Sequence, residues 1–343
     1  MFFIRADSNT TISGGHIMRC LAIANALVER GEKVCFLLAD DNPIPVLEES
    51  GFSYVNLCSN WQDLMTDVEQ VKAILSKEET PFLLIDTYCV TREYVEELKP
   101  LCKIAYLGSK QVYLGKLDFL INYSTDIDHV FYRSNYDKQT ITLLGPSYAP
   151  LRKEFQNVVP AYRKQMKSIL ITTGNTDRHH MVASLIDCLL PVVTEASVKL
   201  EVVVGRMFDD KEELHINYNK IPNVTLYENV KSMSTLMKKC DLAISANGTT
   251  VYELSAMGIP TITFAMVEEQ VKSAEALSGL GVIDYCGRSF ENQKECVTKI
   301  VKQVKYYLEN SDKMIELAKK AHELIDGNGV YLIINAMLSC KEC

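Results

Sequence analysis

A histidine that follows a glycine-containing loop is the first residue whose surroundings suggest chemistry. Residues 2–6 predict a strand, a loop follows, and His16 then stands at or near the N-terminus of a helix. Gly14 and Gly15 let the backbone turn tightly and approach a ligand. The helix end carries a partial positive charge and unpaired N–H groups, which disfavour an imidazolium. We therefore expect His16 to stay neutral and able to accept a proton; the alternative is a histidine that only caps the helix.

A second strand end has the composition of a phosphate-binding loop. The strand at 242–244 is followed by small and hydroxyl-bearing residues, and a helix begins near Thr249. Gly248, Thr249 and Thr250 would offer backbone N–H groups and hydroxyls to a diphosphate. Glu253, about one turn further along, could accept hydrogen bonds from both hydroxyls of a ribose. A capping threonine with a first-turn glutamate explains those two residues separately, but not the glycine and hydroxyls together, so the pattern favours a nucleotide site.

Two further loops follow predicted strands, and we expect them at the carboxyl edges of the predicted sheets. Tyr88 could orient a substrate or water and Asp86 could anchor its loop, although a capped strand end explains both equally well. In the second half, the loop 172–177 contains Gly174 and Asn175 and is expected to line the phosphate side of the site.

Two pairs of adjacent residues invite other interpretations. His179 and His180 suggest a metal, but neighbouring helical residues point about 100° apart and do not converge on one ion. We interpret them as surface residues. Glu268 and Glu269 diverge in the same way, and we expect a solvated loop there, with Gln270 as a sugar contact.

The bulk composition is that of a globular protein with two domains. The chain has 343 residues, 47% of them hydrophobic, and a net charge of −8, which excludes bulk attraction to nucleic acid or anionic lipid. Its eleven cysteines are scattered, and Cys340 and Cys343 lack the second pair of a zinc site. With no signal peptide or membrane span, we expect a cytoplasmic protein without metal or cofactor, and a monomer as the default.

Strands alternate with helical segments in both halves, which predicts an α/β protein with two doubly wound parallel sheets. Prolines and a glycine near residues 145–150 mark the boundary. We expect domains at 1–150 and 151–330, with residues 331–343 packing back on the first. The predicted strands are 2–6, 34–38, 82–86, 103–107, 119–122, 168–172, 200–205, 224–227, 241–245 and 260–264.

These motifs together resemble the UDP-sugar hydrolases of pseudaminic acid synthesis, over residues 3 to 285. The similar segments are Arg5-Ala6-Asp7, Gly15-His16-x-x-Arg19-Cys20, Leu143 to Arg152, Asn247-Gly248-Thr249-Thr250-x-Tyr252-Glu253, and Gln270. Related chains occur in clusters for legionaminic acid and spore-coat polysaccharide. Asn247 stands where the family usually has a glycine.

The resemblance implies a GT-B fold, in which two Rossmann-like domains face a cleft and the nucleotide lies mainly on the second. It implies metal-free release of UDP from a UDP-2,4-diacetamido-2,4,6-trideoxyhexose by water attack at the anomeric carbon. His16 would be the base, with Tyr88 beside it, and Glu253 would bind the ribose. The other expected substrate-binding residues are Gly14, Gly15, Arg19, Gly174, Asn175, Asn247, Gly248, Thr249, Thr250 and Gln270.

Three other functions fit parts of the pattern. A glycosyltransferase on the same fold would pass the sugar to an acceptor hydroxyl, and UDP release without acceptor would distinguish the two. A non-catalytic nucleotide-sugar sensor would bind without turnover. A dehydrogenase is disfavoured because the loop before His16 lacks the GxGxxG fingerprint.

Overall fold

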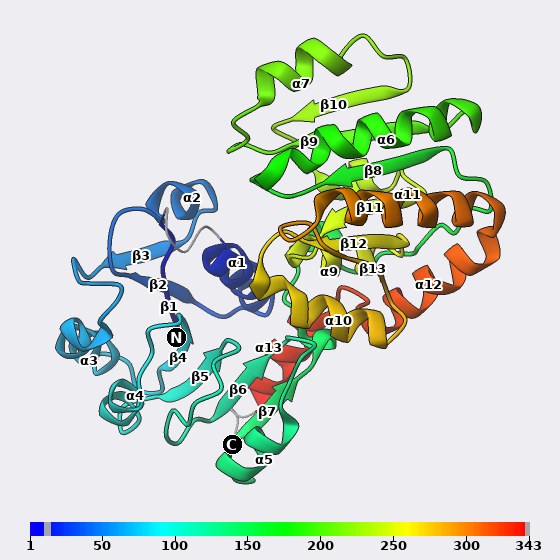
Figure 1. Ribbon diagram of the computed structural model, residues 1–343. Coiled ribbons are helices and arrows are strands. Elements are labelled where there is room, and N and C mark those ends of the chain that lie inside the picture. Colours follow the sequence, from blue (N-terminus) through cyan, green and yellow to red (C-terminus); the bar gives the residue numbers. More distant parts are fainter. Residues whose placement is uncertain (10–14, 340–343) are drawn as a thin grey trace. The chain divides into compact units, whose positions relative to one another are not determined.

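The computed structural model describes residues 1–9 and 15–339 (Figure 1). The chain divides into two compact units. The first unit contains residues 1–153 together with the C-terminal segment from Asn328, and the second contains residues 154–327.

The first unit is built on a parallel seven-stranded sheet with the order β3-β2-β1-β4-β5-β6-β7. Its strands are β1 (Phe2–Ala6), β2 (Val34–Leu38), β3 (Ser53–Asn56), β4 (Phe82–Asp86), β5 (Lys103–Leu107), β6 (Phe119–Asn122) and β7 (Ile141–Leu144). Its helices are α1 (Gly15–Glu29), α2 (Ile44–Glu49), α3 (Val68–Leu75), α4 (Arg92–Leu98), α5 (His129–Asn135) and α13 (Gly329–Ser339).

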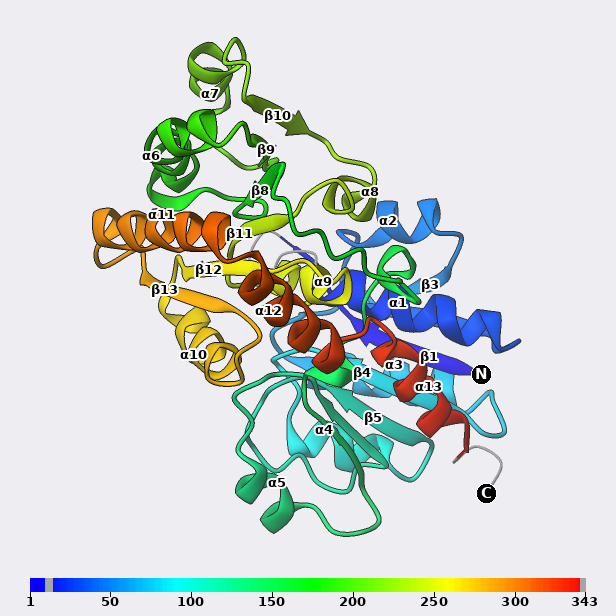
Figure 2. The same cartoon turned by 90° about the vertical axis from the view of Figure 1, so that its right-hand side faces the viewer.

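Helices cover both faces of this sheet. The core on one face combines α1 and α13, which pack against each other (Figure 2), with alternate residues of β1 such as Phe2 and Ile4. The core on the other face combines α3 and α4 with the intervening Phe3. Burial on both faces explains why these strands are continuous apolar runs rather than alternating ones.

The second unit repeats the architecture with a parallel six-stranded sheet, in the order β10-β9-β8-β11-β12-β13. Its strands are β8 (Ser168–Thr172), β9 (Lys199–Val204), β10 (Val224–Glu228), β11 (Leu242–Ala246), β12 (Thr261–Ala265) and β13 (Asp284–Arg288). Its helices are α6 (Met181–Glu195), α7 (Lys211–Tyr218), α8 (Met233–Met237), α9 (Thr249–Ala256), α10 (Val271–Gly279), α11 (Gln293–Glu309) and α12 (Ser311–Leu324).

The prediction of an α/β protein with two parallel sheets is thus confirmed, and this is the architecture of the GT-B fold. The end of one helix follows from local backbone preference. Helix α1 ends before Gly31, which takes a φ of 83° that only glycine adopts easily.

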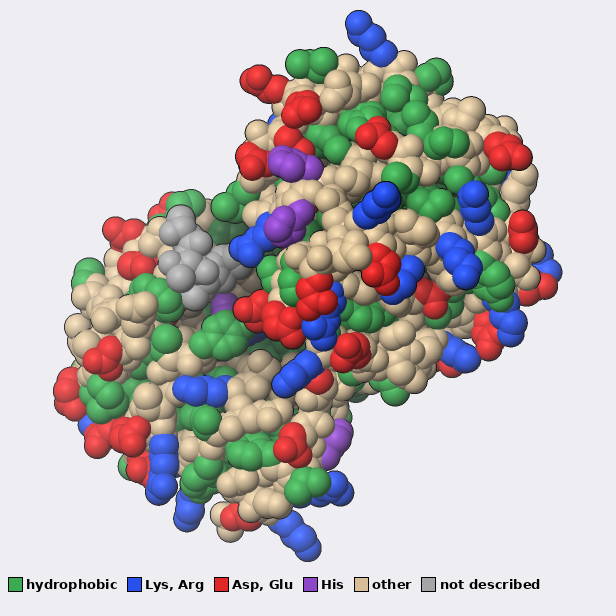
Figure 3. All heavy atoms as spheres, viewed as in Figure 1, with side chains coloured by type: hydrophobic (Ala, Val, Ile, Leu, Met, Phe, Trp, Pro, Cys, Tyr) green, Lys and Arg blue, Asp and Glu red, His purple; other side chains and the backbone are tan. Residues whose placement is uncertain are grey.

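Surface charge and hydropathy add two observations. Acidic and basic side chains are interspersed over the face that Figure 3 shows, without one large basic patch there. Within residues 1–9 and 15–339, none of the helices combines the length and the apolarity of a membrane-spanning segment.

One glycine determines how closely two loops of the second unit approach. Gly205 follows β9, and a Cβ atom added there would lie 2.6 Å from the carbonyl oxygen of Asn175 and still nearer that of Gly174. The same contact includes a hydrogen bond of 2.9 Å from the Met207 N–H to the Asn175 carbonyl. The loops after β8 and β9 therefore pack backbone to backbone.

We predict that Gly205→Ala lowers the free energy of unfolding by about 1–3 kcal/mol, the usual effect of overpacking. Urea-induced unfolding of the full chain would measure the change. Gly279→Ala is the matched control, because a Cβ at the end of α10 meets nothing within 4 Å. Equal midpoints for the two variants would contradict the backbone contact.

Candidate functional site

Asp86 is the last residue of β4 and lies at the centre of the candidate site in the first unit. Strand β4 pairs in parallel with β1, and Asp86 is opposite Ala6 in the register. Because parallel strands end at the same edge, the start of α1 after β1 comes beside the Asp86 side chain. Asp86 is fully buried.

His16, the second residue of α1, is held by this carboxylate. Its Nδ1 lies 2.6 Å from Asp86 Oδ1, and the side chain is buried. An ionised carboxylate can only accept, so the proton of the imidazole is on Nδ1. The Nε2 atom of a neutral His16 is then an acceptor, which is the arrangement of a general base oriented by an acid.

Arg19 keeps Asp86 ionised. Its Nε donates to Asp86 Oδ2 at 2.5 Å, its Nη2 donates to Oδ1, and its Nη1 donates to the hydroxyl of Tyr123 at 2.9 Å. Cys20 donates to the same carboxylate at 3.3 Å. Burial alone would raise the pKa of Asp86, but the charge and hydrogen bonds of Arg19, with His16, hold that pKa below its usual value.

Tyr88, which follows β4, lies beside His16. The ring centroids of His16 and Tyr88 are 4.8 Å apart in an edge-to-face arrangement, and Tyr88 is 54% exposed. Gly15 is the exposed first residue of α1, whereas Gly14 lies outside the described residues.

In the second unit, α9 begins directly after β11 with a glycine at its N-cap. Gly248 has no side chain to cap the helix, so the first turn presents its N–H groups from Thr249 and Thr250. Gly248 and Thr249 are exposed, while Thr250 and Glu253 are half-buried. An uncapped helix N-terminus of this kind favours an anion.

Asn247 and Gln270 fasten this loop to the neighbouring one. Asn247 is buried and donates from Nδ2 to the Gln270 carbonyl at 3.0 Å. Gln270 in turn accepts from the Met266 N–H through its Oε1 at 2.8 Å. The Oδ1 of Asn247 has no hydrogen-bond partner among the described residues.

The loop after β8 lies at the same edge, because Thr172 pairs with Ser245 of β11. Gly174 takes a φ of 87°, and both it and Asn175 are exposed. Asp177 closes the loop by accepting hydrogen bonds from the N–H groups of Met181 and Val182. Burial raises the pKa of Asp177 to about 6, opposed by these hydrogen bonds and helped by the charge of Asp210.

The structure thus brings His16, Arg19 and Tyr88 together in one unit, and the loops of Gly174, Asn247 and Gly248 together in the other. The roles of Asp86 as the partner of His16 and of Arg19 as the partner of Asp86 were missed from sequence. The pairing of β1 with β4 would have indicated both roles. It places the ends of the two strands side by side, although the paired residues are 80 positions apart in the sequence.

Comparison with known proteins finds a family match for the second half of the chain and several distant relatives. Residues 168–335 match the glycosyltransferase family 28 C-terminal domain. A Methanocaldococcus jannaschii protein, Uncharacterized protein MJ1062, is 26% identical over 280 residues, covering 78% of this chain and 56% of that protein. The chain therefore spans little more than half the length of that relative.

Two other relatives carry descriptive names. The spore coat polysaccharide biosynthesis protein SpsG of Bacillus subtilis is 24% identical over 95% of this chain and 94% of its own. A Helicobacter pylori protein named pseudaminic acid cytidylyltransferase and UDP-2,4-diacetamido-2,4,6-trideoxy-beta-L-altropyranose hydrolase is 23% identical over 62% of this chain and 40% of its own.

Solved structures agree on the fold. MurG of Acinetobacter baumannii superposes with a TM-score of 0.66 at 14% identity, covering 98% of this chain and 99% of that one. A putative UDP-N-acetylglucosamine 2-epimerase of Listeria monocytogenes gives 0.65 at 12% identity, covering 99% and 96%. Residues 168–335 are therefore similar to the glycosyltransferase family 28 C-terminal domain, and the chain has the GT-B fold.

Proposed function

We propose that this protein is a nucleotide-sugar hydrolase that releases UDP from a UDP-2,4-diacetamido-2,4,6-trideoxyhexose. The observation that carries the proposal is the buried pair of His16 and Asp86, with 2.6 Å between Nδ1 and Oδ1. The similarity to the Helicobacter pylori protein, whose name includes such a hydrolase, supports the choice of substrate. The family 28 domain supports the nucleotide-sugar class.

In the proposed reaction, Nε2 of His16 takes a proton from water as the water oxygen attacks the anomeric carbon. The bond from that carbon to the diphosphate oxygen breaks, and UDP leaves with the electron pair. Asp86 keeps the accepting nitrogen turned away from itself and stabilises the imidazolium that forms. Tyr88, at the edge of the same ring, would hold the water or the sugar.

The nucleotide half of the proposal rests on the first turn of α9. The N–H groups of Thr249 and Thr250 stabilise the negative charge that develops on the departing diphosphate. Glu253, half-buried on the same helix, binds the ribose hydroxyls. Gly174, Asn175 and Gln270 line the neighbouring loops of that edge.

A glycosyltransferase is the second candidate, favoured by the match of residues 168–335 and by the fold shared with MurG. An acceptor hydroxyl would replace water at His16, with the same base and the same leaving group. Incubation of the purified chain with the UDP-sugar and no acceptor separates the two. UDP release at a steady rate supports the hydrolase, and release only after an acceptor is added supports the transferase.

We predict that His16→Asn lowers kcat by about 10²–10⁴-fold, because the accepting nitrogen is lost. The affinity for UDP should stay within about twofold of wild type, because His16 makes no proposed contact to UDP. Loss of a contact worth about 1 kcal/mol would already weaken UDP binding about fivefold. Calorimetry would measure the affinity. His129→Asn, an exposed histidine at the start of α5, is the control. Near wild-type turnover in His16→Asn would remove the assignment of the base.

We also predict that Asp86→Asn lowers kcat, because Asp86 positions the imidazole of His16. Asparagine can donate to Nδ1 and so favours the tautomer with the proton on Nε2, which lowers kcat by about 10²–10⁴-fold. KM and UDP affinity should change little, and circular dichroism would check that the variant folds. A loss of UDP affinity together with kcat would instead indicate a purely structural role for Asp86.

The nucleotide half has its own test in Glu253→Gln. Loss of the charge should weaken UDP binding by about tenfold, the equivalent of one charge-assisted hydrogen bond. UDP that lacks the 2′ and 3′ hydroxyls of the ribose should bind the variant and the wild type with equal affinity. Glu309→Gln, exposed at the end of α11, is the matched control. Unchanged UDP affinity in Glu253→Gln would exclude the ribose contact.

A further inference from the structure

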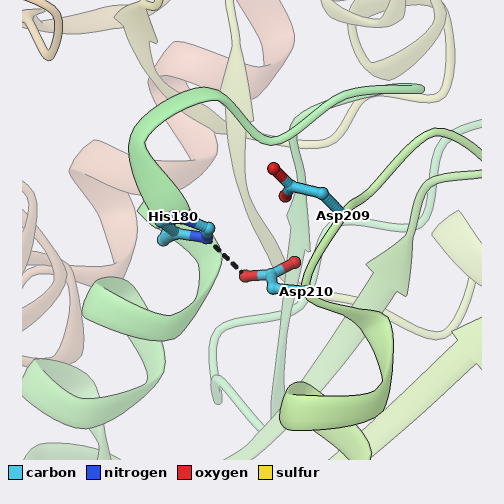
Figure 4. Close-up of side chains that lie close together, drawn as sticks. All are labelled: His180, Asp209 and Asp210. Carbon is cyan, nitrogen blue, oxygen red and sulfur yellow. Dashed lines mark hydrogen bonds and ion pairs between the residues drawn. The ribbon is translucent and has the colours of Figure 1, made fainter.

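A histidine and two aspartates gather at the carboxyl edge of the second sheet, outside the residues used above. His180 precedes α6, and Asp209 and Asp210 precede α7. One ligand atom from each lies within 4.8 Å of the other two. Figure 4 shows the imidazole and both carboxylates turned toward one another from these two loops. His179 is not part of the group.

One oxygen of the buried Asp210 carboxylate has no hydrogen-bond partner among the described residues. The Asp210 side chain is only 7% exposed, and its Oδ2 lies 2.8 Å from His180 Nδ1. The oxygen without a partner in the described part of the chain is Oδ1. Although Asp210 occupies the N-cap of α7, its side chain accepts nothing from that helix. A buried carboxylate oxygen of this kind calls for a donor or a cation.

The neighbouring lysine does not supply that cation. Lys211 follows directly in the sequence, but its Nζ donates to the Arg206 carbonyl at 2.6 Å. Asp209 adds a second carboxylate on the exposed side of the group. The local excess of negative charge is therefore open to an ion from solution.

The loop that carries His180 is held in place by contacts outside the group. Gln293 donates from α11 to the His179 carbonyl at 2.7 Å and to the Ser184 hydroxyl at 3.0 Å. Asp177 fixes the first turn of α6 through two backbone N–H groups. Such anchoring keeps the ligand positions in place before an ion arrives.

We propose that His180, Asp209 and Asp210 bind a divalent transition-metal ion of the Zn²⁺ class. Two ligands of a tetrahedral zinc, each about 2.0–2.1 Å from the ion, lie roughly 3.3 Å apart. The pair at 2.8 Å needs only a small widening to take the ion in place of the proton between them. One imidazole and two carboxylates leave a fourth position for water, and the nitrogen ligand favours zinc over magnesium.

The test is Zn²⁺ binding by the full chain after removal of metals with a chelator. Equilibrium dialysis should find one more bound Zn²⁺ per chain in the wild type than in His180→Ala or Asp209→Asn. Both substitutions are at exposed positions, so both variants should fold. Because the chain has eleven cysteines that can also take zinc, the difference between variants is the readout.

His215→Ala is the matched control. His215 lies 2.6 Å from Glu228 in the same unit, and this second histidine–carboxylate pair is outside the group of potential metal ligands found in the described residues. This variant should keep the wild-type stoichiometry. Zn²⁺ should also raise the melting temperature of the wild type and of His215→Ala, but not of His180→Ala.

Two outcomes would overturn the proposal. One is equal zinc stoichiometry in the wild type, His180→Ala and Asp209→Asn. The other is displacement of the ion by about a hundredfold excess of Mg²⁺, which would mean that the imidazole is not a ligand. Neither readout depends on the hydrolase activity proposed above, so the two proposals fail separately.

Discussion

The buried carboxylate of Asp86 is the constraint on which the first unit's candidate site depends. A charge inside a core is tolerated only when it is paired and hydrogen-bonded, and Asp86 receives donors from His16, Arg19 and Cys20. Each donor comes from the first turns of α1. The same interactions that offset the desolvation of Asp86 therefore fix where α1 begins and how the imidazole is turned.

This coupling explains why one interaction serves both folding and chemistry. Arg19 supplies the counter-charge, so Asp86 stays ionised and can only accept. His16 must then place its proton on Nδ1, which frees Nε2. Tyr123, which accepts from Arg19 Nη1, extends the network to the residue after β6. Among these groups, the Asp86 carboxylate is the acceptor that fixes the tautomer of the imidazole.

Sequence patterns predicted the strands that are buried on both faces and one edge strand, β10, but missed the other three edge strands. Strands β3, β7 and β13 lie at sheet edges or are partly exposed, and segments such as Asp284–Arg288 contain no apolar run. The helix starts near His16 and Thr249 were visible because loops with glycine precede them. The partners of His16 and His180 were not, because Asp86 and Asp210 come from distant segments that only the sheet register brings together.

The two candidate sites handle charge in different ways, and this bears on how a diphosphate would be held. In the first, ions pair with ions, as Arg19 does with Asp86. In the second, Gly248, Thr249 and Thr250 carry no charge and present only helix-end dipoles. Dipoles act over short distances, so the position of the loops matters more than the net charge of −8. The close backbone contact at Gly205 is one contact that fixes that position. A site of this kind strengthens as charge develops on the leaving group and depends on loop packing rather than on a basic side chain.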